Sequence, residues 1–506
     1  MSTIPIYKPA LAMLTDLYEL TMACGYWKLG RQDQQAAFHL YFRHNPFRGG
    51  YSVACGLASV VDFLKQFGFD PSDLDYLATL KGQDGRPLFE SGFLDYLGKL
   101  ELTCDIDAIP EGTVVFPNEP LVRATGSIIQ CQLLETALLN LTNFPTLVAT
   151  KAARVCEAAR GEPVLEFGLR RAQGIDGALS GSRAAYVGGC AGTSNVLAGK
   201  LFGIPVGGTH AHSWVMSFDD EVESFEAYAR AMPNNCVFLV DTYDTLQGVR
   251  NAAEVGRRLK QAGHRLLGIR LDSGDLAYLS IEARKILDAA GLSDAKILAS
   301  NDLTEELIES LKLQGAKIAV WGVGTHLATA YEQPALGGVY KLSAVRDRPD
   351  QPWRYKMKIS EQLAKVSYPG ILQVRRFYRD SHFLADMIYN EPTGVGGGAS
   401  SEIVIVDPTD ITRQRPIDPH ASWEDLLVPV LRGGRCVYDP PPLQETRKRT
   451  GDQLSRLHPT IRRFVNPHEY PVGLEKSLSE LRTRLVMEAR RHGGKPPAPI
   501  AQQEQP

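Results

Sequence analysis

The sequence has no C-x-x-C pair among its eight cysteines, and this absence disfavours both a zinc ribbon and a thioredoxin-like redox site. It has no uninterrupted apolar run of about 18 residues, so we expect no membrane span. Segment 1–20 lacks a basic region and carries Asp16 and Glu19 within its apolar run, so we expect no signal peptide. A formal net charge of -3 offers no basic field for nucleic acid. Together with the scattered thiols, these absences favour a reduced, cytoplasmic setting.

The remaining composition is that of a large globular enzyme. The chain has 506 residues, of which 44% are hydrophobic and 22% are charged. A chain of this length exceeds one ordinary core, and roughly two to four domains are expected. We divide it into an N-terminal α+β domain (1–130), an α/β barrel catalytic domain (131–345), strands that return to the N-terminal domain (346–440), a C-terminal helical segment (441–492) and a disordered tail (493–506).

The N-terminal part begins with a helical pattern and continues with strands. Apolar spacing predicts an amphipathic helix over 10–27. Aromatic-rich segments then predict a strand on each side of the loop 43–51, RHNPFRGGY. This loop mixes cations with glycines, and it fits either a solvated turn or an anion-contacting loop. A helical stretch over 57–101, interrupted at 82–87, follows.

Prolines mark the next two segments. Segment 103–130 alternates and contains three prolines, which is typical of an exposed sheet with edge strands. Segment 132–160 has a long helical pattern, and we expect it to be kinked or divided at Pro145, because proline removes a helical hydrogen bond.

From 164 to 342 short apolar runs alternate with helical periods. This order predicts a parallel sheet with crossover helices. An α/β barrel builds its active site where its strands end, and polar or glycine residues follow the apolar runs here directly. These residues are Asp241, Asp244, Asp272, Asp275, Asn301, Asp302, Gly322 and Gly324.

Two helices of this region have clear predicted ends. One runs over 277–290 and ends at Gly291; the next begins at Asp302, has Glu305 three residues on as in a capping box, and ends near Gly315. Asp302 is therefore either a helix cap or a site acid. Five acids at three successive strand ends exceed what capping requires.

The C-terminal part has weaker patterns. The glycine-rich segment 391–402 is read as a flexible linker, and 401–439 as strands. Six Lys or Arg residues lie within 441–463, a run that is more often solvated than functional. A last amphipathic helix is predicted over 471–491.

Segment 206–218, VGGTHAHSWVMSF, places two histidines, a Gly-Gly pair and the hydroxyls of Thr209 and Ser213 after an apolar run. Histidine titrates near neutral pH, so it can carry a proton, a phosphoryl group or a metal. His-x-His also occurs in metal sites and in plain loops. The segment alone does not rank His210 against His212.

Four groups of segments supply cations, histidines, strand-end carboxylates and a glycine loop. This mixture suits a substrate that carries both a phosphate and a Mg-bound pyrophosphate, because carboxylates and phosphate oxygens bind Mg²⁺ and arginines clamp anions. The groups are 166–174, 206–218, 239–245 with 268–276, and 321–329.

The chain resembles the nicotinate phosphoribosyltransferase family over nearly its whole length. The resemblance rests on LTDLYELTMACGYW, EFGLRRAQG, GTSNVLAGKLFGIPVGGTHAHSWVMSF, LVDTYDT, IRLDSGDL, GVGTHLAT with ALGGVYKL, and LHPTIRRFVNPHEYPVGLE. It implies a type II phosphoribosyltransferase fold, in which an irregular α/β barrel joins a mixed α+β domain built from both chain ends. It also implies a homodimer whose active sites lie at the dimer interface.

The resemblance implies an ATP-coupled ligase of NAD salvage. Nicotinate and 5-phosphoribosyl 1-diphosphate give nicotinate mononucleotide and pyrophosphate, with Mg²⁺ as cofactor and ATP as co-substrate. The phosphorylated histidine of the family's G-T-x-x-H-S pattern corresponds to His212, supported by Thr209 and Ser213, and His210 occupies a variable position. ATP is expected to phosphorylate His212 and so favour a closed state that binds the sugar diphosphate tightly.

Other positions carry over in the same way. Phe167 and Tyr18 would sandwich the pyridine ring, with Tyr18 supplied by the other subunit. Arginines would meet the substrate carboxylate and phosphates, acids would lie near Mg-pyrophosphate or ribose hydroxyls, and a glycine loop would hold the 5-phosphate. The resemblance assigns the arginine role to Arg170 and Arg270 and the acid role to Asp241, Asp272 and Asp302. It assigns the 5-phosphate loop to Gly322, Gly324 and Thr325.

Ser194 distinguishes the two pyridine substrates. In the related nicotinamide enzymes an aspartate follows the Gly-Thr pair that Gly192 and Thr193 form here. A serine can donate to a carboxylate that an aspartate would repel, so nicotinate is favoured over nicotinamide. The alternatives are a nicotinamide phosphoribosyltransferase, a quinolinate phosphoribosyltransferase, which has a shorter chain, and a non-catalytic barrel scaffold.

Overall fold

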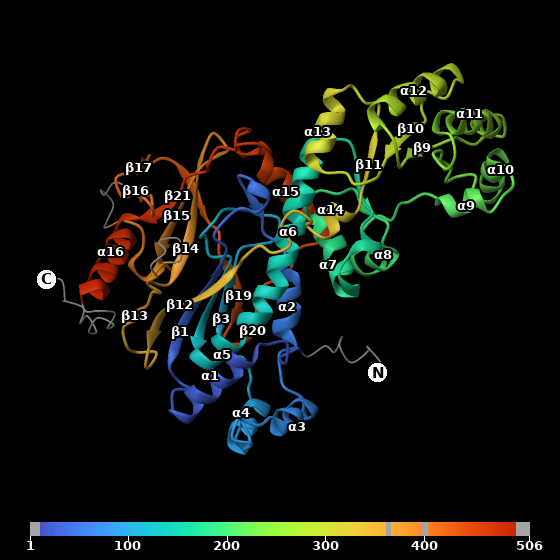
Figure 1. The fold of residues 1–506 in the computed structure, drawn as a ribbon. Coiled ribbons are helices and arrows are strands. Elements are labelled where there is room, and N and C mark those ends of the chain that lie inside the picture. The colour runs from blue at the N-terminus through green and yellow to red at the C-terminus, as the bar shows by residue number, and fades with distance from the viewer. Residues whose placement is uncertain (1–10, 361–365, 397–402, 492–506) are drawn as a thin grey trace.

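The computed structural model describes residues 11–360, 366–396 and 403–491 (Figure 1). The predicted tail 493–506 and residues 397–402 of the predicted linker lie outside these ranges. A long helix, α6 (Glu135–Ala159), runs between the two sheets of the N- and C-terminal segments and the helices that surround a third, parallel sheet. None of the helices in the described ranges is long and apolar enough to span a membrane.

The first sheet has seven antiparallel strands drawn from three distant parts of the chain. Its core contains fully buried residues such as Phe42 and Ile106. The predicted helix 10–27 is confirmed as α1 (Leu17–Lys28), and 57–101 forms α2 (Leu57–Lys65), α3 (Pro71–Thr79) and α4 (Ser91–Gly98). In sheet order the strands are β13 (Arg354–Tyr355), β12 (Val339–Arg346), β1 (Gln35–Tyr41), β5 (Val122–Ser127), β3 (Asp105–Ala108), β19 (Val428–Arg432) and β20 (Arg435–Cys436).

The prediction of an exposed edge sheet over 103–130 is wrong. Strands β3 and β5 lie inside the seven-stranded sheet, and Ile106 and Ala124 are fully buried. The three prolines fall in the turns between β3, β4 (Val114–Val115) and β5, where no ladder hydrogen bond is needed. Prolines therefore marked the strand ends and not an edge. Strand β4 pairs with β2 (Ser52–Val53) in a small separate sheet.

We expected a kink or a division at Pro145; the division is wrong, and the kink stays a prediction. Helix α6 runs through Pro145 as one helix, and the chain divides at Leu134, between α5 (Ile128–Leu133) and α6. Proline cannot donate to the carbonyl four residues earlier, which belongs to Leu141. That carbonyl faces Gly56, where a Cβ would come within 2.0 Å of it.

The other C-terminal strands form a second six-stranded sheet. Its order is β17 (Gln414–Ile417), β16 (Ile403–Val406), β21 (Val472–Glu475), β15 (His382–Asn390), β14 (Leu372–Arg379) and β18 (Ser422–Asp425). The predicted last helix is shorter than 471–491, because β21 precedes α16 (Lys476–Arg491).

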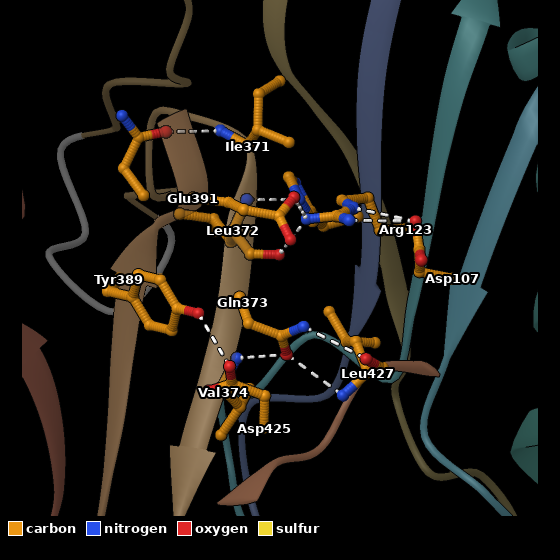
Figure 2. A network of polar contacts seen from close by, with 12 residues as sticks. Asp107, Arg123, Ile371, Leu372, Gln373, Val374, Tyr389, Glu391, Asp425 and Leu427 are labelled. Atoms are coloured by element: carbon orange, nitrogen blue, oxygen red, sulfur yellow. Dashed lines mark hydrogen bonds and ion pairs between the residues drawn. The ribbon is translucent and has the colours of Figure 1, made fainter. Parts of the chain in front are cut away.

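Polar contacts join this sheet to the seven-stranded one (Figure 2). Arg123 on β5 donates to Asp107 on β3 (Nη2 to Oδ2, 2.9 Å), to the carbonyl of Leu372 (3.2 Å), and forms an ion pair with Glu391 (2.7 Å). The buried His39 ring accepts from the Leu372 amide (3.0 Å). Because these groups are paired on both sides, the two sheets hold a fixed relative position.

Two basic segments pack more closely than their composition predicts. Arg447 and Arg449 of α15 (Leu443–Ser455) donate to the carbonyls of Gly189 and Glu111. The solvated-run interpretation is therefore wrong for these arginines. In the loop 43–51, the Phe47 amide donates to Gln333 (3.1 Å), so this loop is attached to the barrel region and is not a free turn. Its contact with an anion stays a prediction.

The barrel region contains six parallel strands that form a curled, open half-barrel. The strand order is β7 (Gly192–Thr193), β6 (Val164–Glu166), β11 (Val320–Val323), β10 (Lys296–Ala299), β9 (Gly268–Leu271) and β8 (Val237–Leu239). The helices between them are α7 (Gly174–Val187), α8 (Val196–Phe202), α9 (His212–Met216), α10 (Glu221–Ala231), α11 (Thr245–Gln261), α12 (Leu276–Ala289), α13 (Glu305–Leu313) and α14 (Thr325–Ala328). The predicted parallel α/β architecture is confirmed.

Helix caps differ from the prediction at one position. Asp302 does not cap α13; the cap is Thr304, whose hydroxyl accepts from the Leu307 amide (3.2 Å). Asp244 and Asp275 are instead the caps of α11 and α12. The loop after β10 is two residues longer than the capping-box pattern assumed, so the helix starts later. Asp302 is thereby left exposed at the strand end.

Candidate active site

The predicted site residues follow the carboxyl ends of the parallel strands. Phe167 follows β6, Ser194 follows β7, Asp241 lies just past β8, Asp272 follows β9, and Gly324 follows β11. Since the strands are parallel, these ends lie at one edge of the half-barrel. Hydrogen bonds between neighbouring strand ends then fix the side chains relative to one another.

The two histidines of segment 206–218 have different environments. His212 is the first residue of α9, and its side chain is 40% exposed. Its Nδ1 lies 3.2 Å from the Thr242 hydroxyl and its Nε2 lies 3.8 Å from Asp272 Oδ2. His210 is buried, and burial lowers its pKa to about 4. Only His212 is therefore accessible to a substrate.

Arg270 connects the ends of β9 and β10 to the segment that carries the two histidines. Its guanidinium donates to the Ser300 hydroxyl (2.7 Å), to the Thr209 hydroxyl (3.1 Å) and to Asp272 Oδ1 (2.8 Å). Ser300 also donates to the same Asp272 oxygen. The guanidinium carbon lies 5.7 Å from the centre of the Phe167 ring. This places a fixed cation next to an aromatic face, which suits a flat anionic ring.

Asp241 has one carboxylate oxygen in use and one free. Oδ2 accepts from the Asp272 amide (3.0 Å) and from the Ser273 hydroxyl (2.6 Å). Oδ1 is buried and has no hydrogen-bond partner within the described residues. Across the described parts of the chain, no group of three or more His, Cys, Asp or Glu side chains is placed to bind a metal. A cation at this position would need further oxygens from a substrate.

Small residues make room for the Phe167 ring. The Phe167 amide donates to the Val323 carbonyl (2.8 Å), which fixes the backbone beside β11. A Cβ at Gly322 would lie 2.7 Å from two ring carbons of Phe167, and a Cβ at Gly168 would lie 2.2 Å from the Cβ of Ala328. A side chain at either position would therefore displace its neighbour, the Phe167 ring at Gly322 and Ala328 at Gly168. Thr325 follows as the first residue of α14.

Glu166 is a site residue that the sequence analysis missed. Its side chain is almost fully buried, and its carboxylate accepts from the Gly168 amide and from the hydroxyls of Ser182 (2.8 Å) and Thr193 (2.6 Å). The Thr193 hydroxyl in turn accepts from the Asn195 amide (2.9 Å). The carboxylate therefore ties the end of β6 to the end of β7 and to α7. It fixes the separation of the two predicted ring-contacting residues that follow these strands.

The missed residues had a common but weak signal. Thr242, Ser273 and Ser300 each stand beside a predicted strand-end residue, and Glu166 lies inside EFGLRRAQG. Hydroxyl residues at strand ends were not weighed as partners of the acids. Their pairing depends on which strands are neighbours, and that information is not local in the sequence.

Several predicted residues take no part in the side-chain hydrogen bonds that join Glu166, Asp241, Arg270 and Asp272 to their partners within the described residues. Arg170, Ser213 and Asp302 are exposed. Ser194 lines a cavity of about 520 Å³ together with apolar residues of α7 and α8. Tyr18 is 46% exposed on α1, which lies at the opposite end of the molecule from α9–α12 (Figure 1). A single chain therefore does not bring Tyr18 to Phe167.

Three family models match successive parts of the chain. The nicotinate phosphoribosyltransferase (NAPRTase) N-terminal domain matches residues 13–143, the NAPRTase family 163–348, and the NAPRTase C-terminal domain 372–482. Together the matched ranges cover most of the described chain.

Similar proteins extend over almost the same length. A nicotinate phosphoribosyltransferase of Bacillus subtilis is 42% identical over 477 residues, with 92% of this chain and 93% of the relative covered. The human enzyme of that name is 36% identical over 531 residues, with 93% and 96% covered. The crystal structure of human nicotinic acid phosphoribosyltransferase matches with a TM-score of 0.80 at 34% identity, covering 93% of this chain and 99% of that one. A nicotinate-nucleotide pyrophosphorylase of Pyrococcus furiosus matches with a TM-score of 0.66 at 21% identity, which shows likeness of fold alone.

Proposed function

The chain belongs to the nicotinate phosphoribosyltransferase family, and we propose that it joins nicotinate to 5-phosphoribosyl 1-diphosphate, giving nicotinate mononucleotide and pyrophosphate in NAD salvage. The observation that carries the proposal is the Arg270 cluster, in which a fixed guanidinium lies beside the Phe167 ring and the Asp272 carboxylate. The Phe167 ring offers an aromatic face to the pyridine ring, and Arg270 offers a cation to its carboxylate. The neighbouring acids would lie near the pyrophosphate group of the sugar diphosphate.

The nicotinate ring would lie against Phe167, and its carboxylate would meet Arg270, Arg170 and Ser194. Stacking suits a flat heteroaromatic ring, and a serine donates to a carboxylate. The ring nitrogen carries no proton at neutral pH, so its attack on the anomeric carbon needs no general base. Glu166 would hold Phe167 and Ser194 at the correct separation through its contacts with both strand ends.

The sugar diphosphate would lie across the acid cluster and the glycine loop. Gly322, Gly324 and Thr325 at the end of β11 would surround the 5-phosphate, as strand-end loops do in α/β barrels. The free oxygen of Asp241 fits a hydrated Mg²⁺, with Asp272, whose amide donates to the same carboxylate, and the exposed Asp302 proposed as further partners through water. When bound with pyrophosphate, Mg²⁺ neutralises the charge that develops on this leaving group.

We further propose that ATP phosphorylates His212. Its exposure makes the imidazole reachable, and Thr242 occupies Nδ1, so Nε2 is the nitrogen that would accept the phosphoryl group while ADP leaves. The phosphate would add about -1.5 to -2 of charge beside Arg270, within a cluster that Thr209 and Ser213 complete. Each 1.4 kcal/mol by which this cluster favours the state that binds the sugar diphosphate would raise the affinity about tenfold.

The site would be completed in a homodimer. Tyr18 and its neighbours Leu14, Leu17 and Met22 expose apolar surface on or beside α1. The cavity next to Ser194 is lined by Leu169, Ile175, Val196 and Leu197, which are also exposed. Tyr18 of a second copy would reach this cavity and close the ring site. The eight cysteines form no disulfide, which supports our proposal that the protein acts in the reducing cytoplasm.

The reaction is tested by pyrophosphate release from purified protein with nicotinate or nicotinamide, each with and without ATP. We expect nicotinate to be used and ATP to accelerate its turnover. His212→Asn should abolish both the acceleration and protein-bound phosphate, whereas the exposed His420→Asn should change neither. Ser194→Asp should lower nicotinate turnover relative to nicotinamide. Wild-type preference for nicotinamide, or ATP stimulation of His212→Asn, would contradict the proposal.

The dimer is tested by complementation. Tyr18→Ala and His212→Asn chains are each expected to have little ATP-stimulated activity alone, and this ATP-stimulated rate is the readout. A mixed dimer has one site with both native residues if Tyr18 crosses the interface, so random mixing should restore about a quarter of the wild-type rate. No recovery after verified subunit exchange would contradict a shared site.

A further inference from the structure

The half-barrel is open between β7 and β8, and segment 205–211 lies in this opening. On the β7 side the segment continues the sheet by backbone hydrogen bonds: the Thr193 amide donates to the Pro205 carbonyl and the Gly207 amide donates to the Thr193 carbonyl, both at 3.0 Å. A parallel bridge joins Thr193 to Val206. This side of the segment is therefore attached as a strand would be.

The β8 side is attached in another way. The Val240 amide donates to the Arg270 carbonyl on β9 (3.2 Å), so the preceding amide, that of Leu239, points to the opposite, open edge. There His210 Nε2 accepts it at 3.3 Å. Across the described residues no backbone hydrogen bond joins 205–211 to β8. The imidazole takes the position that a strand carbonyl would have.

The surroundings of His210 hold it in this role. The side chain is 8% exposed, and its ring centre lies 5.0 Å from that of Tyr228, 6.1 Å from Phe225 and 6.2 Å from Phe238. With the pKa lowered to about 4 by burial, the ring is neutral at neutral pH and Nε2 keeps a lone pair for the amide. Nε2 is thus occupied by the Leu239 amide, and Nδ1 is buried without a partner within the described residues, so neither nitrogen is exposed to ATP.

We propose that His210 is a positioning residue, whose imidazole fastens segment 205–211 to β8 across the open side of the half-barrel and thereby places His212 at Thr242 and Asp272. Two contacts then run in parallel: His210 meets Leu239, and His212 meets Thr242 three residues further along. Loss of the first contact frees the segment that carries the second. The consequence for catalysis rests on the proposed function of His212.

The test compares two replacements of similar bulk. His210→Gln retains an oxygen that can accept the Leu239 amide, and His210→Leu retains none. His420→Leu, on an exposed loop before β18, is the matched control. We expect His210→Leu to slow phosphoryl transfer from ATP to His212 about tenfold or more. The KM for nicotinate should change less, by about two- to threefold, because Arg270 loses only the contact with Thr209 and keeps its contacts with Ser300 and Asp272. His210→Gln should stay within about threefold of wild type.

Hydrogen exchange of the Leu239 amide gives a readout independent of activity. We expect faster exchange in His210→Leu and near-native exchange in His210→Gln. Unchanged Leu239 protection in His210→Leu, equal phosphorylation in His210→Leu and wild type, or equal loss in Gln and Leu variants with native circular dichroism would each overturn the proposal. If wild-type protein takes no phosphoryl group from ATP, the proposed function fails, and the exchange result alone decides the role of His210.

Discussion

Replacing Gly322 by alanine is predicted to displace the Phe167 ring while leaving the barrel folded. The new Cβ would lie 2.7 Å from both Cδ2 and Cε2 of the ring, whereas carbon atoms pack at about 3.5–4.0 Å, so the ring must move by about 1 Å. The next nearest atom, the Cβ of Ser300, is at 3.4 Å. Because the ring is only partly buried, it can move without disturbing the strand.

The size of the effect follows from the contacts that the ring makes. A well-placed aromatic pair contributes about 0.5–1.5 kcal/mol, so we expect the affinity for nicotinate to fall by about two- to twelvefold. The ring would also leave its place 5.7 Å from the Arg270 guanidinium. The KM for 5-phosphoribosyl 1-diphosphate should change less, since the alanine side chain is directed at Phe167.

Steady-state kinetics and thermal unfolding of Gly322→Ala measure both parts of this prediction. Gly451→Ala is the control, because a Cβ at this exposed position of α15 meets no atom within 4 Å. It should keep wild-type kinetics and stabilise the helix slightly, as alanine does in place of glycine. An unchanged nicotinate KM in Gly322→Ala, or an unfolded Gly322→Ala protein, would show that the ring does not determine binding as argued.

Three further predictions concern buried or strand-end carboxylates. In Glu166→Gln a side-chain NH₂ group would face hydroxyl and amide donors, so a buried donor is left without an acceptor. We expect the free energy of unfolding in urea to fall by about 1–3 kcal/mol and the nicotinate KM to rise. Unchanged stability would contradict the role of Glu166 in joining the ends of β6 and β7. Asp241→Asn should raise the Mg²⁺ concentration for half-maximal rate about tenfold, measured at saturating substrates, while a purely structural role would lower kcat alone. Burial and the neighbouring Asp386 raise the pKa of Glu119 well above its ordinary 4.5, so folding stability should fall as pH rises above 4.5 towards the folded pKa. Glu119→Gln removes this loss and should stabilise the protein more at pH 8 than at about pH 5 in urea unfolding, and an equal difference at both pH values would refute it.

Local patterns predicted the elements of the barrel well because each depends on neighbouring residues. The helix expected over 277–290 is observed as α12, and the strand ends fall where apolar runs stop. The errors arose where contacts between segments far apart in the sequence determine the structure. Segment 103–130 is buried because β1 and β19, from other parts of the chain, flank its strands β5 and β3. Helix α6 continues through Pro145 as one helix.

The site residues also differ in whether local sequence or contacts between distant segments place them. The positions of Asp241 and Asp272 followed from the strand ends, since the carboxyl ends of parallel strands lie at one edge of the sheet, whereas Arg270 followed only from the resemblance to the family. The hydroxyl partners Ser300 and Thr242 did not follow, because their pairing needs the order of the strands, β10 beside β9 and β8 beside the segment of the histidines. The sequence thus predicted the acids at the strand ends, and the structure adds the hydroxyl groups that hydrogen-bond to them or to their neighbours.

The two histidines show what kind of information a motif lacks. His210 and His212 are two residues apart, and in a continuous strand both would lie on one face. The extended Ala211 ends the strand-like segment and α9 begins at His212, so the chain turns between them. No side chain caps this five-residue helix, and its start therefore has no sequence signal. What makes His210 a buried acceptor is the aromatic pocket that later elements supply, and that pocket consists of Phe225, Tyr228 and Phe238.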